Sequence, residues 1–257
     1  MNRTVRTWVL VVGVLGVGAV LLIGLLDLPP FGRADHPYRD AAVTAAVAHA
    51  TSNVVTSINF DQRAYDTLGE EVILFGSVVA VAALLRPGDD EELRRAPATR
   101  DPLQATRLIG YLLLPLTLVV GVDVVAHGAV TPGGGFQGGV VLATGLHLLY
   151  VAGEYRSLER LRPELVFEVG EAVGAAGYLA VGLAGLAGTG AFLTQLLPRG
   201  SFAELLSAGT VPLLNVAVGI AVGSGVVVLL GQFLRQVELV AKDDGRNDGD
   251  PSTGEDR

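Results

Sequence analysis

A glycine-rich octapeptide, Pro132–Gly139, constrains the fold of this chain more than any other feature. Five of its eight residues are glycine, and it lies in a run from Val124 to Gly153 that contains no Asp, Glu, Lys or Arg. Glycine permits positive φ angles and close approach of neighbouring backbone. At membrane depth, irregular backbone is tolerated only where it is buried in protein or lines a polar cavity. The octapeptide therefore predicts a chain with several membrane spans that works within a larger assembly.

Composition supports a membrane location. Half of the 257 residues are hydrophobic, and the mean hydropathy is +0.50. We expect an all-α multi-pass protein of the cell membrane with about six transmembrane helices and a glycine-rich break between helices 3 and 4. The second span has only 14 uncharged residues and can cross the bilayer only if the preceding Leu68–Glu71 also enters it. The expected spans are Trp8–Leu26, Val72–Leu85, Leu108–Ala126, about Gly134–Gly153, about Leu165–Gly188 and Pro212–Leu234.

Several functional classes are excluded or disfavoured by residue content. The absence of cysteine excludes disulfides, thiolate metal sites and iron–sulfur clusters. The four histidines show no metal-ligand spacing, and the chain lacks a phosphate-binding loop that would couple ATP hydrolysis to transport. The net charge of −8 does not suggest binding to nucleic acid. We expect no cofactor, no metal site and no enzymatic activity in this chain.

The distribution of basic residues predicts the orientation of the spans. If the N-terminus is cytoplasmic, 14 of the 18 Lys and Arg residues fall in cytoplasmic segments. Cytoplasmic loops carry such an excess in membrane proteins. We therefore expect both termini to be cytoplasmic.

Composition also divides the chain into four parts. Residues 1–86 hold two spans, and residues 87–107 form a polar cytoplasmic linker. Residues 108–234 hold four further spans, and residues 235–257 form an acidic tail that we expect to be disordered. Between the first two spans, Ala41–Asn59 is expected to form an amphipathic surface helix, and the sequence leaves open whether it enters the bilayer.

Two pairs of ionisable residues are candidates for an ion or proton pathway. Asp66 and Glu70 are four residues apart and share a helical face, whereas Glu71 lies on another face and is expected to tolerate substitution better. Carboxylates at membrane depth usually bind protons or cations, but near a helix N-terminus in the headgroup region they have a purely structural role. Asp123 and His127 also share a face, either as a proton relay or as an interfacial helix end.

The octapeptide and its surroundings resemble a known family. The residues from His127-Gly128 through Val140, with Gly209-Thr210-Val211-Pro212-Leu213-Leu214-Asn215, are similar to the MnhB/MrpB subunits of multi-subunit Na⁺/H⁺ antiporters. Equivalent subunits occur in membrane-bound hydrogenases. The resemblance covers about Thr106 to Leu234. It marks the octapeptide as a helix-packing and assembly motif: Pro132, Gly133, Gly134, Gly135, Phe136, Gln137, Gly138 and Gly139.

The first part of the chain resembles a second component, the MbhE-like module at the C-terminal end of MrpA-type subunits. The similar residues are Asn53–Thr56 and Asp61–Glu70, although the family usually has Arg-Gly where this chain has Arg63-Ala64. The chain is thus similar to a fusion of two neighbouring subunits.

The two resemblances imply an accessory subunit of a Na⁺/H⁺ antiporter driven by the proton gradient, with Asp66 and Glu70 in the ion pathway. They imply MrpA-, C-, D-, E-, F- and G-like partner subunits and transported Na⁺ and H⁺. Two alternatives remain open at this stage. The chain could belong to the ion-translocating module of a hydrogenase-like respiratory complex, or it could be a purely structural scaffold.

Overall fold

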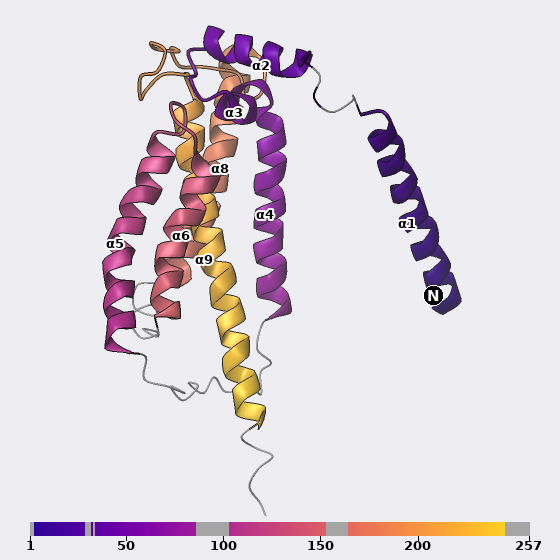
Figure 1. Ribbon diagram of the computed structural model, residues 1–257, viewed down its shortest axis with the longest axis vertical. Coiled ribbons are helices and arrows are strands. Elements are labelled where there is room, and N and C mark those ends of the chain that lie inside the picture. The colour runs from indigo at the N-terminus through magenta and orange to yellow at the C-terminus, as the bar shows by residue number, and fades with distance from the viewer. Residues whose placement is uncertain (1–2, 29–31, 33, 86–102, 153–163, 245–257) are drawn as a thin grey trace, which may run out of the picture. The chain divides into compact units, whose positions relative to one another are not determined.

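The computed structural model of the chain describes residues 3–28, 32, 34–85, 103–152 and 164–244. All regular elements in these residues are helices (Figure 1), which confirms the predicted all-α class. The chain divides into two compact units, residues 1–41 and residues 42–257. The two units are described separately below.

The first unit contains helix α1, Arg3–Leu26. Its 24 residues give a length of about 36 Å at 1.5 Å per residue. The segment Thr4–Leu26 is apolar and long enough to span a membrane, and none of its spanning window is buried inside the chain. The predicted first span, Trp8–Leu26, therefore lies within α1.

In its described residues, the second unit is a bundle of five long helices, four of which pack around α9 (Figure 1). Helix α9 contacts each of the other four, and 61% of its spanning window is buried, compared with 22% or less for the other candidate spans. Its many small residues allow this central position, because glycine and alanine let neighbouring backbones approach closely in lipid. The helices are α4 (Ala64–Leu84), α5 (Gln104–Ala126), α6 (Gly135–Val151), α8 (Glu164–Thr189) and α9 (Val211–Asp244).

Five of the six predicted spans form helices long and apolar enough to cross a membrane, with lengths of 21 to 25 residues. Helix α4 reaches this length because it begins at Ala64, so that Leu68–Glu71 belong to it. Helix α6 is shorter, with 17 residues or about 26 Å. It begins at Gly135 directly after the glycine-rich break and ends at Val151, inside the predicted span.

Two predicted boundaries are wrong. The stretch Ala41–Asn59 is not one helix: α2 (Pro37–Ala48) ends, α3 (Val54–Ser57) begins after a turn, and a π-helical segment, Ile58–Gln62, follows. Ala50 in the turn has φ +56°, which a continuous helix does not allow. In addition, α9 continues to Asp244, so the tail that was expected to be disordered from residue 235 begins as helix. Residues 245–257 and most of the linker at 87–107 lie outside the described residues.

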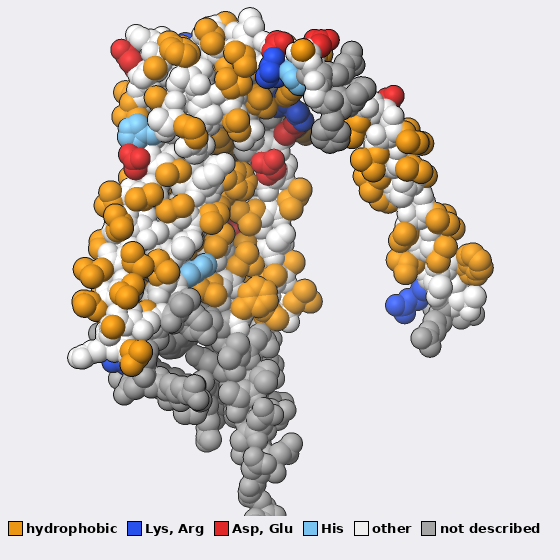
Figure 2. Space-filling view, viewed as in Figure 1, with side chains coloured by type: hydrophobic (Ala, Val, Ile, Leu, Met, Phe, Trp, Pro, Cys, Tyr) orange, Lys and Arg blue, Asp and Glu red, His pale blue; other side chains and the backbone are white. Residues whose placement is uncertain are grey.

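The outer surface of the bundle fits a lipid environment. Large apolar side chains are exposed along its helices, for example Val72 at 62% and Leu116 at 58%. In the space-filling view, hydrophobic side chains cover the flanks, and most charged side chains gather near the end that holds α3 (Figure 2). Burying this apolar surface in lipid removes it from water, which favours insertion.

Candidate functional site

The predicted pair Asp66 and Glu70 lies on the exposed face of α4. Asp66 forms an ion pair with Arg63, and both side chains are more than half exposed in this chain. Glu70, one turn further along, is exposed too. The two acids share a face, as their spacing predicts, and this face is available to lipid or to another subunit.

The adjacent Glu71 points into the bundle and is only 3% exposed. It lies on the buried face of α4 with Ala64, Thr67 and Val78. A second acid, Glu171 of α8, is 5% exposed. The Oε1 atom of each carboxylate is buried and has no hydrogen-bond partner among the described residues.

The burial of Glu71 removes the reason for expecting it to tolerate substitution. The sequence places it on a different face from Glu70, and the structure confirms this. That face, however, is the one that packs against the bundle. A change at Glu71 therefore acts inside the protein and not at its surface.

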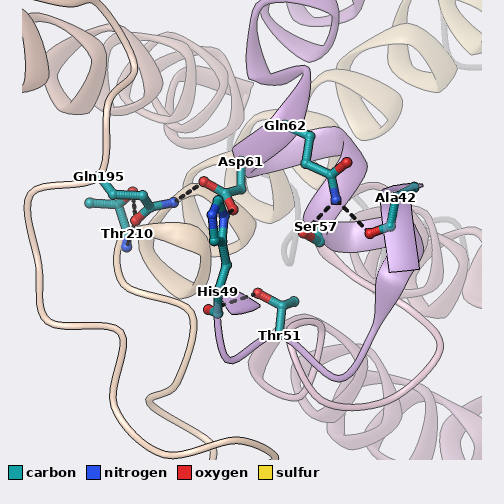
Figure 3. Close-up of polar contacts among 8 residues, drawn as sticks. All are labelled: Ala42, His49, Thr51, Ser57, Asp61, Gln62, Gln195 and Thr210. Carbon is teal, nitrogen blue, oxygen red and sulfur yellow. Dashed lines mark hydrogen bonds and ion pairs between the residues drawn. The ribbon is translucent and has the colours of Figure 1, made fainter. Parts of the chain in front are cut away.

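A polar network connects three segments at the end of the bundle near α3 (Figure 3). The Asp61 carboxylate, 7% exposed, is in contact with His49 Nδ1 and accepts a hydrogen bond from Gln195 Nε2 at 3.0 Å. The Gln195 carbonyl oxygen in turn accepts hydrogen bonds from the amide and hydroxyl of Thr210, at 2.7 and 2.8 Å. Asp61 thus fixes the loop between α8 and α9 to the first part of the chain.

His49, Asp61 and Gln195 border a cavity of about 500 Å³ that is also lined by Arg63 and Arg199. Because two arginines line this cavity together with Asp61, it does not have the excess of acidic residues expected of a cation site. Gln62 stabilises the same region by donating to the Ala42 carbonyl and to Ser57 Oγ, both at 3.1 Å. The network is best explained as a structural connection.

The second predicted pair, Asp123 and His127, lies where α5 ends. Their side chains are in contact, with 2.9 Å between His127 Nδ1 and Asp123 Oδ1, and are 42% and 64% exposed for His127 and Asp123 respectively. His127 is the C-cap residue of α5. The spacing therefore predicts the contact correctly, and the exposed position matches an interfacial helix end.

The glycine-rich octapeptide forms the break between α5 and α6 and the start of α6. Gly133 and Gly134 have φ angles of +145° and +134°, which favour glycine over other residues. Gly139 packs against α9, where an added Cβ would lie 2.9 Å from Gly223 N. The expected combination of an irregular backbone and close helix packing is therefore present, with the packing inside this chain.

Asn215 of α9 fixes the start of α6. It is fully buried, and its side-chain oxygen accepts a hydrogen bond from the Gly135 amide at 2.8 Å. Its Nδ2 donates to the Val211 carbonyl at 3.1 Å. The first amides of a helix have no partner within the helix, so Asn215 provides one from a neighbouring helix.

The octapeptide region is also bonded to the first part of the chain. Asn53 Nδ2 donates to the carbonyl oxygens of Gly128 and Thr131, both at 2.8 Å. The backbone N–H of Asn53 donates to the Ala129 carbonyl, and Ser52 Oγ donates to the Val130 carbonyl. The two sequence stretches that carry separate family resemblances therefore meet in one hydrogen-bonded junction.

Comparison with known proteins identifies the family. A family model described as a domain related to the MnhB subunit of Na⁺/H⁺ antiporter matches residues 105–228. An uncharacterized protein of Methanocaldococcus jannaschii, MJ1307, is 33% identical over 201 residues, which cover 67% of this chain and 73% of that protein. The chain carries an MnhB-related domain at residues 105–228 and belongs to the same family as MJ1307.

Two solved structures resemble this MnhB-related chain in fold. One is a chain of the membrane-bound sulfane sulfur reductase (MBS), an archaeal respiratory membrane complex, with a TM-score of 0.69 and 30% identity. The match covers 90% of this chain and 98% of the MBS chain. The other, from the Mrp complex of Dietzia sp. DQ12-45-1b, has a TM-score of 0.64 and 23% identity. Here the match covers 90% of this chain but only 26% of a much longer chain, and it shows the fold alone.

Sequence reasoning missed the importance of the buried acids of this MnhB-related chain. A signal was available in the residues around Glu71. Ala64 lies seven residues before it, Thr67 four residues before it and Val78 seven residues after it. That spacing places them on the same helical face as Glu71. In a membrane helix, however, apolar residues occur on every side, so this face does not stand out.

Proposed function

We propose that this chain is an accessory membrane subunit of a multi-subunit cation/proton antiporter, in which Na⁺ export is driven by the proton gradient. The observation that carries this proposal is the MnhB-related domain at residues 105–228. The likeness in fold to a chain of an Mrp complex, over 90% of this chain, supports it. The multi-pass architecture, with five candidate spans, fits a location in the cell membrane.

The accessory role follows from the distribution of ionisable side chains. Helix α6 and the segment Val211–Phe233 of α9 contain no Asp, Glu, Lys or Arg. A proton or cation crossing a hydrocarbon core about 30 Å thick needs such groups or water between them. The remaining part of the pathway would therefore reside in MrpA-, C-, D-, E-, F- and G-like partner subunits.

Within this chain, the proposed contribution to the pathway is the exposed face of α4. Asp66 and Glu70 lie on this face, where a partner subunit can reach them. A pair of carboxylates can exchange a proton for Na⁺, because negatively charged, hard oxygen atoms bind either cation. Arg63 pairs with Asp66 in this chain, so cation binding requires Asp66 to leave that pair. Asp123 and His127 remain a weaker proposal for the same pathway.

The test is antiport by the assembled complex in inverted membrane vesicles, measured as Na⁺-dependent proton movement with a pH-sensitive dye. Asp66→Asn and Glu70→Gln preserve size and hydrogen bonding but remove the negative charge. Each is expected to reduce exchange strongly. Asp40→Asn is the matched control because Asp40 also forms an exposed ion pair, with Arg39 at 2.7 Å, but outside the long helices. Full exchange in the double variant would refute a role for Asp66 and Glu70.

A respiratory complex is a second candidate for the parent assembly. The observation that favours it is the match to an MBS chain, which includes 98% of that chain at 30% identity. The subunits that co-purify with the tagged chain in mild detergent would distinguish the two. Redox-cofactor subunits would indicate a respiratory complex, and their absence together with antiporter-like subunits would indicate an antiporter. If the chain is a purely structural scaffold, cation/proton exchange by the assembled complex should be unchanged in all acid-to-amide variants.

A further inference from the structure

We propose that Glu71 of α4 and Glu171 of α8 together form a proton-binding site inside the membrane-spanning part of this chain. The site is separate from the exposed pair Asp66 and Glu70. The two carboxyl groups share at least one proton, which neither could give up without leaving two negative charges in an apolar surrounding. The evidence is their common level in the bundle, their burial and the lack of a basic residue in the described spans of α4, α8 and α9.

The two acids lie at the same level of the bundle. Tyr178 of α8 donates a hydrogen bond to the Ala64 carbonyl at the start of α4, with 2.8 Å between the atoms. Glu71 follows Ala64 by seven residues, and Glu171 precedes Tyr178 by seven residues. Helices α4 and α8 run in opposite directions, so both acids lie on the same side of this bond, about 10 Å or two helical turns from it. Glu71 shares a face of α4 with Ala64, and Glu171 shares a face of α8 with Tyr178.

The space for the Glu171 carboxylate is provided by a glycine of α9. Glu171 Oε1 lies 2.9 Å from the position that a Cβ on Gly225 would take, and Val78 Cγ2 of α4 lies 3.3 Å from the same Cβ position. Any larger residue at position 225 would therefore displace the carboxylate. The carboxylate is enclosed by α4 and α9, and its own helix completes the site.

The described spans of the three helices that carry Glu71, Glu171 and Gly225 supply no basic side chain to the pair. In Ala64–Leu84, Leu165–Thr189 and Val211–Phe233, the chain contains no Lys, Arg or His. The neighbouring titratable residues on the same helices, Glu70 beside Glu71 and Glu168 three residues before Glu171, are also acids. Helix α9 has two buried polar residues close to Gly225 in the sequence, Ser224 and Gln232. Both are uncharged.

These conditions favour a proton as the ligand. Two buried carboxylates without a counter-ion repel each other and lose hydration, so one of them is stable only when protonated. A hard metal cation generally takes six or more oxygen ligands. Among the described residues there is no group of three or more His, Asp or Glu side chains that could hold a metal ion.

The consequence for transport rests on the proposed function. Glu71 is the sequence neighbour of Glu70, so the buried site lies directly behind the exposed acid pair on α4. A proton stored on the buried pair could be passed to Glu70 when Na⁺ leaves the exposed face. The site itself requires only the fold and the membrane, and it can be tested without transport.

The test is infrared spectroscopy of the purified full chain in lipid, which detects the C=O stretch of protonated carboxyl groups. At neutral pH the wild-type chain is expected to show this band, and alkaline titration should remove it. The band should be lost in the double variant Glu71→Gln, Glu171→Gln. It should remain in Glu204→Gln, which changes an exposed acid in the loop between α8 and α9. An identical band in the wild type and the double variant would overturn the proposal.

Further variants keep the test decisive if the double variant does not fold. Glu71→Gln and Glu171→Gln should each retain a band at a shifted frequency, because one buried carboxyl group remains. Gly225→Ala places a methyl group against Glu171 and should shift the band without removing an acid. Unshifted bands in all three variants would contradict a shared site. Loss of the wild-type band when Na⁺ is added at constant pH would also contradict it. A persistent band together with full antiport in the Asp66 and Glu70 variants would refute the proposed pathway only.

Discussion

Replacing Asn215 by Ala should destabilise the contact between α6 and α9. Asn215 is fully buried and forms hydrogen bonds with the Gly135 amide and the Val211 carbonyl. The Val211 carbonyl is within a helix and keeps its backbone partner. The Gly135 amide begins α6 and loses its side-chain acceptor.

The magnitude follows from this unpaired amide. Leaving one buried donor without an acceptor costs about 1–3 kcal/mol. Gly128 and Gly134 lie against the oxygen that is lost. A Cβ on these glycines would be 2.7 and 2.8 Å from Asn215 Oδ1 respectively. At about 1.4 kcal/mol for each factor of ten, the fraction of open bundle should rise about 5- to 150-fold.

Thiol labelling can measure this change, because the chain contains no cysteine. Ala143 of α6 is 1% exposed, so a cysteine introduced by Ala143→Cys reacts only when the bundle opens. The labelling rate in mild detergent should rise by the same factor when Asn215→Ala is added. Leu213→Ala is the control, since Leu213 belongs to the same helix and is 50% exposed. Equal labelling rates with and without Asn215→Ala would refute the argument that Asn215 holds α6 in place.

Three further predictions concern orientation, assembly and autonomy. A cysteine at Ser201 should react with a membrane-impermeant reagent from outside the cell, whereas one at Ser157 should not; the reverse pattern would invert the topology. Gly135→Leu should lower the yield of assembled complex more than it alters ion exchange, because a side chain there collides with the Asn215 carbonyl and Val218; normal yield with lost exchange would indicate a glycine-lined ion path. The chain reconstituted alone should move neither Na⁺ nor H⁺ across vesicle membranes, and Na⁺-dependent proton movement would contradict the accessory role.

The sequence predicts most of the helical architecture because long apolar runs without charge have few alternatives in a bilayer. It also predicts the irregular backbone at Gly133 and Gly134 from composition alone. The turn after α2 was not predicted, because the Ala- and Thr-rich stretch contains no proline or glycine from Ala41 to Asn59. Its backbone turns where tertiary contacts, such as the bonds from Asn53 to the glycine-rich segment, compensate for the lost helix.

The candidate site was predicted only in part for a related reason. Helical spacing places Asp66 and Glu70 on one face and Glu71 on another, and both statements are correct. Which of these faces is buried depends on α8 and α9, which follow about a hundred residues or more later. The pairing of Glu71 with Glu171 is likewise a property of the packed bundle, since neither local spacing nor hydropathy relates the two positions.

The central position of α9 has a consequence for how the protein is made. This helix comes last among the described helices, yet it contacts each of the other four in the bundle. During synthesis, α4, α5, α6 and α8 therefore enter the membrane before their common packing partner exists. Until α9 arrives, the Gly135 amide has no Asn215 to bind, and the carboxylate of Glu171 has no Gly225 against it. A chain interrupted before residue 211 would lack both contacts, and α4, α5, α6 and α8 would have no central helix to pack against.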